Sequence, residues 1–421
     1  MANQTAKNIL AFYDKACKQL STNNTFADKM ELSTKSGVDM QNANNVYWES
    51  VEQQAPVVEG LDLSGTTAGS IIQQTYPLNV EAPRNDWFTL RAEELRDSTF
   101  MERRAVAGAK RLSADWNKRA ADLVSSTGSL YYESSSAGYD FVAEARTLMT
   151  ERQAYEDMGS SFFLTPRNNQ IMGSDLASRS LYPNSRSEEA YATGMIGKNV
   201  AGFDLFEAPT YGIQAAAVNA TTTTVAADVI EVPESFTTVG GSIQNIDYRF
   251  GTISLTAATN YRVGDVVTAG VNSLGISDKT NTGQLMTFKI IEVNTNDIVV
   301  YPKPIAADQA GITSSQAAYA NISTAITSGA TVAKVNVAGG QSNSFWANDS
   351  MCFVNADGNL NALNDFDGMK VDSQTLDNGI KLYIAYDAKL DTLNCRVRLF
   401  TWGGLVNKDP SRNGNAVYVP A

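Results

Sequence analysis

Apolar residues recur at helical spacing along one long segment, Trp87 to Ser126. Gaps of three and four place them on one face of a helix, apart from one slip between Leu95 and Met101. No proline interrupts the segment, and Gly108 is its one glycine. The pattern predicts a single helix roughly 55–60 Å long. The stripe comprises Phe88, Ala92, Leu95, Met101, Ala105, Ala109, Leu112, Trp116, Ala120 and Leu123.

The other faces of this predicted helix are charged along most of their length. The narrow apolar stripe is sufficient to bind one thin sheet, which leaves the charged faces for solvent or for neighbouring subunits. We therefore interpret the helix as a spine, with Trp87 and Phe88 as core residues at its start. The basic residues are Arg91, Arg96, Arg103, Arg104, Lys110, Arg111, Lys118 and Arg119, and the acidic ones are Glu93, Glu94, Asp97, Glu102, Asp115 and Asp122.

An amphipathic helix and an extended hairpin are predicted before the spine. The helix covers 6–20, with apolar residues on one side. Residues 46–51 are rich in aromatic and β-branched residues, which is typical of a strand, and residues 72–80 alternate with period two. Because an isolated hairpin is only marginally stable, we expect this one to pack on something else, such as another subunit.

The composition changes at Val218, after a predicted helix over 141–158 and a buried strand over 161–164. Residues 218–304 are rich in Thr, Val, Gly and Asn and lack a helical period, with strands predicted at 223–232, 252–257, 265–269, 284–293 and 298–301. This spacing indicates a small barrel or sandwich inserted into a mixed host domain. Residues 306–329 again have helical character, and strands follow at 380–386 and 395–402.

Composition excludes several kinds of chemistry. The chain has 421 residues, 43% hydrophobic and 19% charged, as in ordinary globular proteins. It has no histidine, which excludes His-dependent triads, zinc hydrolase motifs and His-based facial triads. The three cysteines lack metal or redox spacing, so no metal, cofactor or disulfide is expected. No secretory signal or membrane-spanning run is present, which predicts a cytoplasmic protein.

Few motifs suggest a site. The net charge of −12 disfavours tight, sequence-independent DNA binding. Residues 365–368 (Asp-Phe-Asp-Gly) approach a calcium loop but lack its remaining acidic ligands, so an acidic turn is the better interpretation. Neighbouring carboxylates such as Glu93 and Glu94 point in different directions on a helix and favour solvated charge over catalysis. Arg103 and Arg104 lie among acidic residues, which favours pairing within the chain or between subunits.

Several short runs together resemble one known family. Although each run is short, the matches lie in order over nearly the whole chain, and the series is similar to the major capsid (coat) protein of short-tailed double-stranded-DNA bacteriophages, of the Salmonella-phage coat-protein type. The runs are residues 85–97, 51–56 followed by 59–63, 200–204, 302–304 leading to 318–321, and 345–347.

The resemblance implies an α+β tailed-phage capsid fold: an N-terminal arm, an extended loop, a peripheral domain with a long spine helix, and an axial domain carrying an inserted β-barrel. Applied to this chain, it gives an arm at 1–45, a hairpin loop at 46–83 and a peripheral domain at 84–135. The axial domain then covers 136–217 and 306–395 around a barrel at 218–305, and the chain returns to the peripheral domain at 396–421.

The resemblance also implies a function. Copies of the chain would assemble into pentamers and hexamers of an icosahedral shell, with a scaffolding protein, a portal at one vertex, and enclosed DNA that is not bound in a sequence-specific way. Assembly would take place in the host cytoplasm. We predict interface roles for loop residues Trp48, Glu52, Glu59 and Asp62, for spine residues Arg103, Arg104 and Arg111 of a neighbour, and for Asp247 and Arg249 of the barrel near local two-fold axes, with Asp14 meeting the scaffolding protein.

Two other functions stay open from the residues alone. The β-rich region could be a carbohydrate-binding module on a virion surface, which binding of glycans by that region would reveal. The chain could also be a His-free hydrolase that uses carboxylates, which loss of activity on mutating one acidic residue would reveal. No catalytic motif supports the hydrolase, so the chain is predicted not to be an enzyme.

Overall fold

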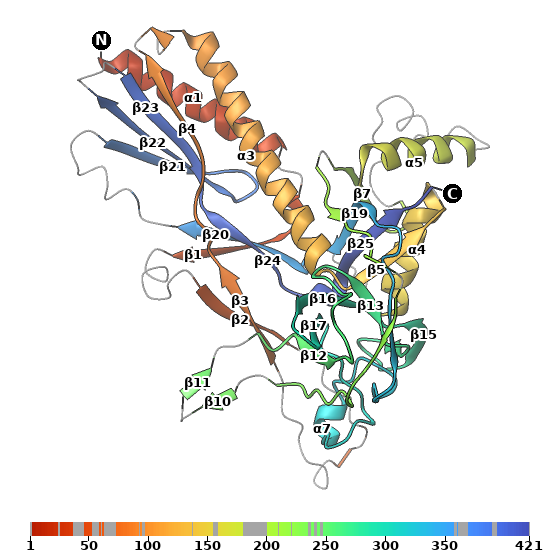
Figure 1. The fold of residues 1–421 in the computed structure, drawn as a ribbon. Helices are drawn as coiled ribbons and strands as arrows, with labels where there is room; N and C mark the ends of the chain where they lie inside the picture. The colour runs from red at the N-terminus through yellow and green to blue at the C-terminus, as the bar shows by residue number, and fades with distance from the viewer. Residues whose placement is uncertain are drawn as a thin grey trace. The chain divides into compact units, whose positions relative to one another are not determined.

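A computed structural model of the chain describes most of its length, in two compact units (Figure 1). Unit 1 comprises residues 1–47, 78–120 and 352–406, and unit 2 comprises 48–77, 121–351 and 407–421. The described residues are 2–23, 26–36, 46–52, 59, 61–62, 73–91, 93–94, 97–136, 138–154, 159–179, 200–208, 210–219, 221–234, 237–239, 242–244, 247–357, 360, 369–389 and 394–420. Residues 365–368, the acidic turn, lie outside them.

Unit 1 is built on a four-stranded antiparallel sheet in the order β21-β22-β23-β4. Helices α1 and α3 lie along this sheet (Figure 1), and their apolar residues share one core with it. A three-stranded sheet, β1-β20-β24, adjoins this core through Phe353. The elements that lie wholly or mostly in this unit are α1 (Ala2–Asn23), β1 (Glu31–Ser36), β4 (Arg84–Arg91), α3 (Ser98–Thr127), β20 (Met351–Asp357), β21 (Met369–Thr375), β22 (Lys381–Lys389), β23 (Asn394–Thr401) and β24 (Gly403–Asn407), with a 3-10 turn at Ala27–Lys29.

The predicted spine helix begins eleven residues later than its pattern suggested, and the prediction for residues 87–97 was wrong. Residues 84–91 form strand β4, whose burial alternates as it pairs with β23. The helix begins at Ser98, where the carboxylate of Asp97 accepts hydrogen bonds from the backbone N–H of Thr99 and Phe100. Trp87 is 68% exposed, so it is not a core residue. The slip in the apolar stripe, between Leu95 and Met101, contains the start of the helix.

Unit 2 contains a mixed sheet of five strands in the order β5-β25-β19-β6-β7, with β8 pairing at one end of β19. Helix α4 packs on this sheet through a core that includes stacked Phe162 and Phe345. The predicted strand at 161–164 is confirmed, and the predicted helix after the spine is shorter than expected. The elements are β5 (Leu130–Ser134), α4 (Tyr139–Glu151), β6 (Ser160–Leu164), α5 (Pro166–Arg179), β7 (Asp204–Glu207), β8 (Ile213–Gln214), β19 (Gly340–Ala347) and β25 (Asn413–Tyr418), with a 3-10 turn at Pro410–Arg412.

The β-rich region folds into a closed barrel, one of the two architectures that its strand spacing indicated, although the strand predicted at 223–232 is limited to Thr223–Thr224. Its sheet has the order β12-β17-β16-β13-β18-β9, and the end strands meet where the N–H of Ala226 donates to the C=O of Ser254 and the N–H of Thr256 to the C=O of Thr224. Such closure leaves the sheet without free edges. The strands are β9 (Thr223–Thr224), β12 (Gly251–Ser254), β13 (Val266–Thr268), β16 (Phe288–Val293), β17 (Asp297–Tyr301) and β18 (Thr331–Lys334).

The barrel takes its strand β18 from beyond residue 305. The helical character expected for 306–329 was wrong apart from α7 (Ser314–Ala317), because most of this segment runs irregularly and returns to the barrel. Residues 294–297 connect β16 to β17 as a hairpin, as predicted. Three two-stranded pairs complete the described strands: β2 (Val46–Glu52) with β3 (Gln73–Asn79), β10 (Thr237–Val239) with β11 (Ser242–Gln244), and β14 (Asn272–Leu274) with β15 (Asn281–Leu285).

Candidate assembly surfaces

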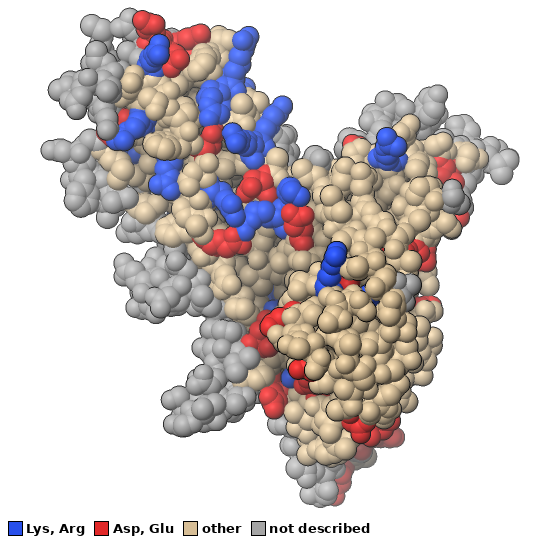
Figure 2. All heavy atoms as spheres, viewed as in Figure 1, with Lys and Arg blue, Asp and Glu red and all other residues tan. Residues whose placement is uncertain are grey.

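A basic stripe runs along the exposed face of α3. Figure 2 shows basic side chains gathered over this helix. The stripe comprises Arg103, Lys110, Arg111 and Lys118, all exposed. Successive members of the stripe are seven, one and seven residues apart, which keeps them on one side of the helix. The buried Ala105, Leu112 and Trp116 lie on the opposite side. In a chain with a net charge of −12, such a stripe is a local exception that favours an acidic partner surface.

Arg104, predicted as an interface residue with Arg103 and Arg111, is used inside the subunit. Its guanidinium forms an ion pair of 2.6 Å with the buried carboxylate of Asp86 and lies 4.2 Å from the ring centre of Phe88. Both partners lie on β4, so the pair fixes α3 against this strand. A second ion pair within the subunit joins Arg119 of α3 to Glu81. Of the three predicted spine residues, Arg103 and Arg111 are therefore the exposed ones.

The acidic loop residues that were expected to meet the spine lie between β2 and β3. Glu59 and Asp62 are both exposed. Trp48 and Glu52 lie on β2, but their side chains are outside the described part of the chain. The hairpin itself is confirmed, since β2 and β3 pair with one another.

Asp247 and Arg249, the predicted barrel residues, contact one another within the chain. Two hydrogen bonds, of 2.9 and 2.6 Å, join the guanidinium to the carboxylate. The same guanidinium donates to the backbone C=O of Asn407 and Lys408. Burial lowers the pKa of Arg249, but the hydrogen bond and charge of Asp247 outweigh it and raise the pKa above its ordinary value. The pair therefore ties the 247–250 turn to the C-terminal segment.

Asp14 lies on the exposed side of α1, next to Lys15 and with Lys18 one turn further along. The opposite side of the helix carries Phe12 and Tyr13, which are buried in the core of unit 1. The phenol of Tyr13 donates to the backbone C=O of Leu382. The polar face that carries Asp14 is thus held outward by the packing of the apolar face.

The three cysteines lie in the core. Cys17, Cys352 and Cys395 are buried free thiols, as predicted, and burial raises the pKa of Cys17 to about 12, which suppresses its thiolate. Among the described residues, no group of three or more Cys, Asp or Glu could hold a metal ion. None of the described helices is long and apolar enough to span a membrane.

Comparison with known proteins identifies the family to which the chain belongs. The model of the family described as "P22 coat protein - gene protein 5" matches residues 1–417. A solved chain of Mycobacterium phage Che8 is 12% identical, covering 93% of this chain and 90% of that chain with a TM-score of 0.42. The capsid of Cyanophage P-SCSP1u is 9% identical over 94% and 88%, with a TM-score of 0.45. The CUS-3 coat protein I-domain is 25% identical over 28% and 97%, with a TM-score of 0.23.

The family match spans nearly the whole chain, including the arm, the hairpin, α3 and the barrel. It decides between the capsid function and the carbohydrate-binding alternative in favour of the capsid. It also confirms the α+β capsid fold that the sequence resemblance implied. The chain belongs to the P22 coat protein family and is a structural subunit of a bacteriophage capsid, not an enzyme.

Proposed function

We propose that copies of this subunit assemble into pentamers and hexamers by laying the acidic loop between β2 and β3 over the basic stripe of a neighbour's α3. The observation that carries this proposal is the exposure of opposite charges on two elements, Glu59 and Asp62 on the loop and Arg103 and Arg111 on the helix. Exposed ion pairs contribute only about 0–1 kcal/mol each, so they set register and partner choice more than strength.

The strength of the shell comes, in this proposal, from many modest interfaces repeated by symmetry. The segments predicted from the sequence serve as the functional parts, with β18 added to the barrel, and the arm, loop and peripheral domain make contacts around each capsomer. The barrel contributes contacts between capsomers near local two-fold axes. Because the charges of Asp247 and Arg249 are neutralised within the chain, the 247–250 turn contacts its partner by shape and not through an open ion pair.

The polar face of α1 is the proposed docking site for a scaffolding protein. Asp14, Lys15 and Lys18 are exposed together there, so a partner with mixed charge is the best fit. Shells form in the host cytoplasm and include a portal at one vertex. The DNA is enclosed without sequence-specific binding, because an acidic subunit repels a polyanion and leaves it free to move during packaging.

The test is to express the full chain with and without its scaffolding partner and to examine the products by electron microscopy and analytical sedimentation. We expect closed shells with the partner, and aberrant or slower assembly without it. Replacement of Asp14 by alanine should reduce co-sedimentation of the partner with the shells, while the exposed Lys370, on β21, serves as a control for surface mutation. A subunit that stays monomeric under every condition contradicts the proposed mode of assembly.

A further inference from the structure

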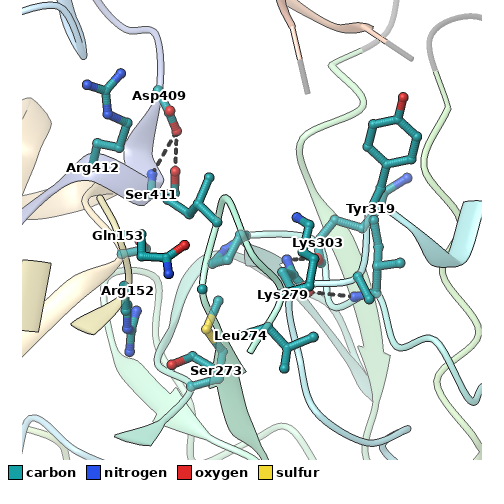
Figure 3. Close-up of a pocket in the computed structure, with 18 of the residues that line it drawn as sticks. Arg152, Gln153, Ser273, Leu274, Lys279, Lys303, Tyr319, Asp409, Ser411 and Arg412 are labelled. Carbon is teal, nitrogen blue, oxygen red and sulfur yellow. Dashed lines mark hydrogen bonds between the residues drawn. The ribbon is translucent and has the colours of Figure 1, made fainter. Parts of the chain in front are cut away.

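A cavity of about 350 Å³ in unit 2 is lined by more basic than acidic residues. Its walls come from the end of α4, from the barrel and the loop between β14 and β15, and from the segment 408–412 (Figure 3). Its volume is within the range of small-ligand sites. One acidic residue, Asp409, lines it, against six basic ones: Arg152, Arg249, Lys279, Lys303, Lys408 and Arg412.

Three of the cations already have carboxylate partners. Arg249 pairs with Asp247 and Lys303 lies 3.7 Å from Glu231. Arg412 donates two hydrogen bonds to Asp349. Neither Arg152 nor Lys279 forms an ion pair with another described residue, and the carboxylate of Asp409 already accepts hydrogen bonds from Ser411. The cavity therefore has an excess of positive charge.

Arg152 gives the strongest evidence that the cavity binds an anion. It is only 5% exposed, and burial lowers its pKa to about 10. One nitrogen, Nη2, donates to the C=O of Leu285 and the hydroxyl of Thr287, at 3.1 and 3.2 Å. Its Nε is buried and has no acceptor in the structure. The charge of neighbouring Glu151 acts on Arg152 without forming an ion pair, and a buried guanidinium with an unused donor is costly unless an anion completes it.

The loop that carries Lys279 is fastened to Arg152 and its neighbour. The N–H of Ile276 donates to the C=O of Arg152 at 3.1 Å. The side chain of Gln153 accepts hydrogen bonds from the N–H of Ser277 and Asp278. Gln153 and Lys279 both have positive φ, 56° and 57°. Backbone held in this sparsely populated region often marks a binding site, and here it places Lys279 on the same cavity as Arg152.

We propose that this cavity binds a small oxyanion of the phosphate class, with Arg152 and Lys279 as its principal ligands. Guanidinium and ammonium groups are the usual partners of phosphate oxygens in proteins. The bound anion would join the end of α4 to the loop between β14 and β15 and so brace the barrel against the host part of its unit. The proposal is independent of shell assembly, because every ligand belongs to one subunit.

The experiment is calorimetric titration of the unassembled full-length subunit with sodium phosphate and, separately, with pyrophosphate, at constant ionic strength. We expect saturable binding of at least one of them, and a preference between the two distinguishes a single from a condensed phosphate. Lys279→Asn removes the charge while asparagine tolerates the positive φ. Loss of one charge-assisted hydrogen bond should weaken binding about tenfold or more.

Lys370→Asn, which removes an exposed lysine on β21, is the matched control and should leave the affinity unchanged. Arg152→Gln should abolish saturation. If that variant does not fold, Lys279→Asn still decides the question. Absence of saturable heat with both anions, or equal affinity in the Lys279→Asn protein, overturns the proposal, whether or not the subunit forms shells.

Discussion

The indole N–H of Trp116, on α3, donates a 2.7 Å hydrogen bond to the hydroxyl of Thr401 at the end of β23. Both side chains are buried, at 2% and 0% exposure. The ring of Trp116 also packs edge-on against Phe353, with the ring centres 5.0 Å apart. One residue thus ties the helix to two sheets of unit 1.

Thr401→Val should destabilise the subunit, because it leaves the indole N–H of Trp116 buried without an acceptor while the shape of the side chain is kept. We expect a loss of about 1–3 kcal/mol in the free energy of unfolding. Urea denaturation of the unassembled subunit measures it. Thr375→Val, at an exposed position of β21, is the control and should lie within about 0.5 kcal/mol of the wild type. Equal losses in the two variants would show that the hydrogen bond is unimportant.

Asp86→Asn tests whether the ion pair between Asp86 of β4 and Arg104 of α3 contributes more to stability than an exposed charge does. The carboxylate is 6% exposed, and the change replaces its ion pair with Arg104 by a hydrogen bond from the guanidinium to an uncharged amide, which leaves the cation without its counter-charge. A loss of about 1–3 kcal/mol is expected, with little dependence on salt because the pair is largely buried. Glu102→Gln, at an exposed position of α3, provides the comparison. Strong weakening of the effect by salt would argue against a buried ion pair.

Trp87→Thr tests the corrected position of the strand. A tryptophan in the core would cost about 3–5 kcal/mol on truncation, whereas one exposed on a strand should cost well under 1 kcal/mol. Threonine keeps the preference for strand at this site. We therefore expect nearly unchanged urea denaturation of the unassembled subunit. A loss of several kcal/mol would restore the core role that the helical pattern suggested.

These variants also show what the sequence could and could not predict. The apolar face of α3 from Met101 to Ala120, the core positions of Met286, Phe288 and Ile290 in the barrel, and the hairpin at 294–297 follow from local patterns, and each was predicted correctly. The strand at Trp87 was not, because its partner β23 lies some 300 residues away in the sequence and imposes a period of two on a stretch that also fits a helix. Local periodicity cannot decide such a case.

The charged residues also include some whose roles the sequence predicted and some whose roles only the structure shows. The sequence identified Arg103, Arg104 and Arg111 as a group, but only tertiary contacts show that Arg104 is engaged by Asp86. Asp247 and Arg249 are two residues apart, yet the groups that complete their site are the carbonyls of Asn407 and Lys408. Arg152 and Lys289 carry no local signal at all, because burial of a charged side chain is decided by segments distant in the sequence.

Lys289 gives a pH dependence that can be measured. It is fully buried on β16, and its ammonium donates to the side-chain carbonyl of Gln214 at 2.6 Å. Burial lowers its pKa to about 7, although the nearby charge of Asp265 opposes this. The unfolded lysine keeps its ordinary pKa near 10.5, so unfolding takes up a proton between these values. The contribution of Lys289 to stability therefore rises with pH from about 7 towards 10.5.

Lys289→Met should remove this rise while keeping the apolar stem. Between pH 7.5 and 9.5, the wild type should gain stability over the variant by up to about 1.4 kcal/mol per pH unit. Urea denaturation of both proteins at each pH gives the difference. Lys370→Met, at an exposed site, should run parallel to the wild type. Parallel profiles for Lys289→Met as well would mean that this lysine is not desolvated in the folded subunit.

Charge exchange between the loop and the helix tests the proposed subunit contact. Arg111→Glu removes a cation from the basic stripe of α3 and places like charge opposite Glu59 of a neighbour, so it should slow shell formation. Glu59→Arg alone should do the same. The double variant restores opposite charges in the reverse order, and its assembly should recover in part, because the effects of residues in contact are not additive.

Sedimentation at low and high salt measures the assembled fraction. The single-variant defects should shrink as salt screens the repulsion, since the Debye length falls from about 10 Å at 0.1 M to about 3 Å at 1 M. Lys370→Glu makes the same change of charge outside the stripe and should assemble like the wild type. If the double variant is as defective as the sum of the two single ones at every salt concentration, Glu59 and Arg111 do not meet. The register of the loop on the helix must then be set by other residues.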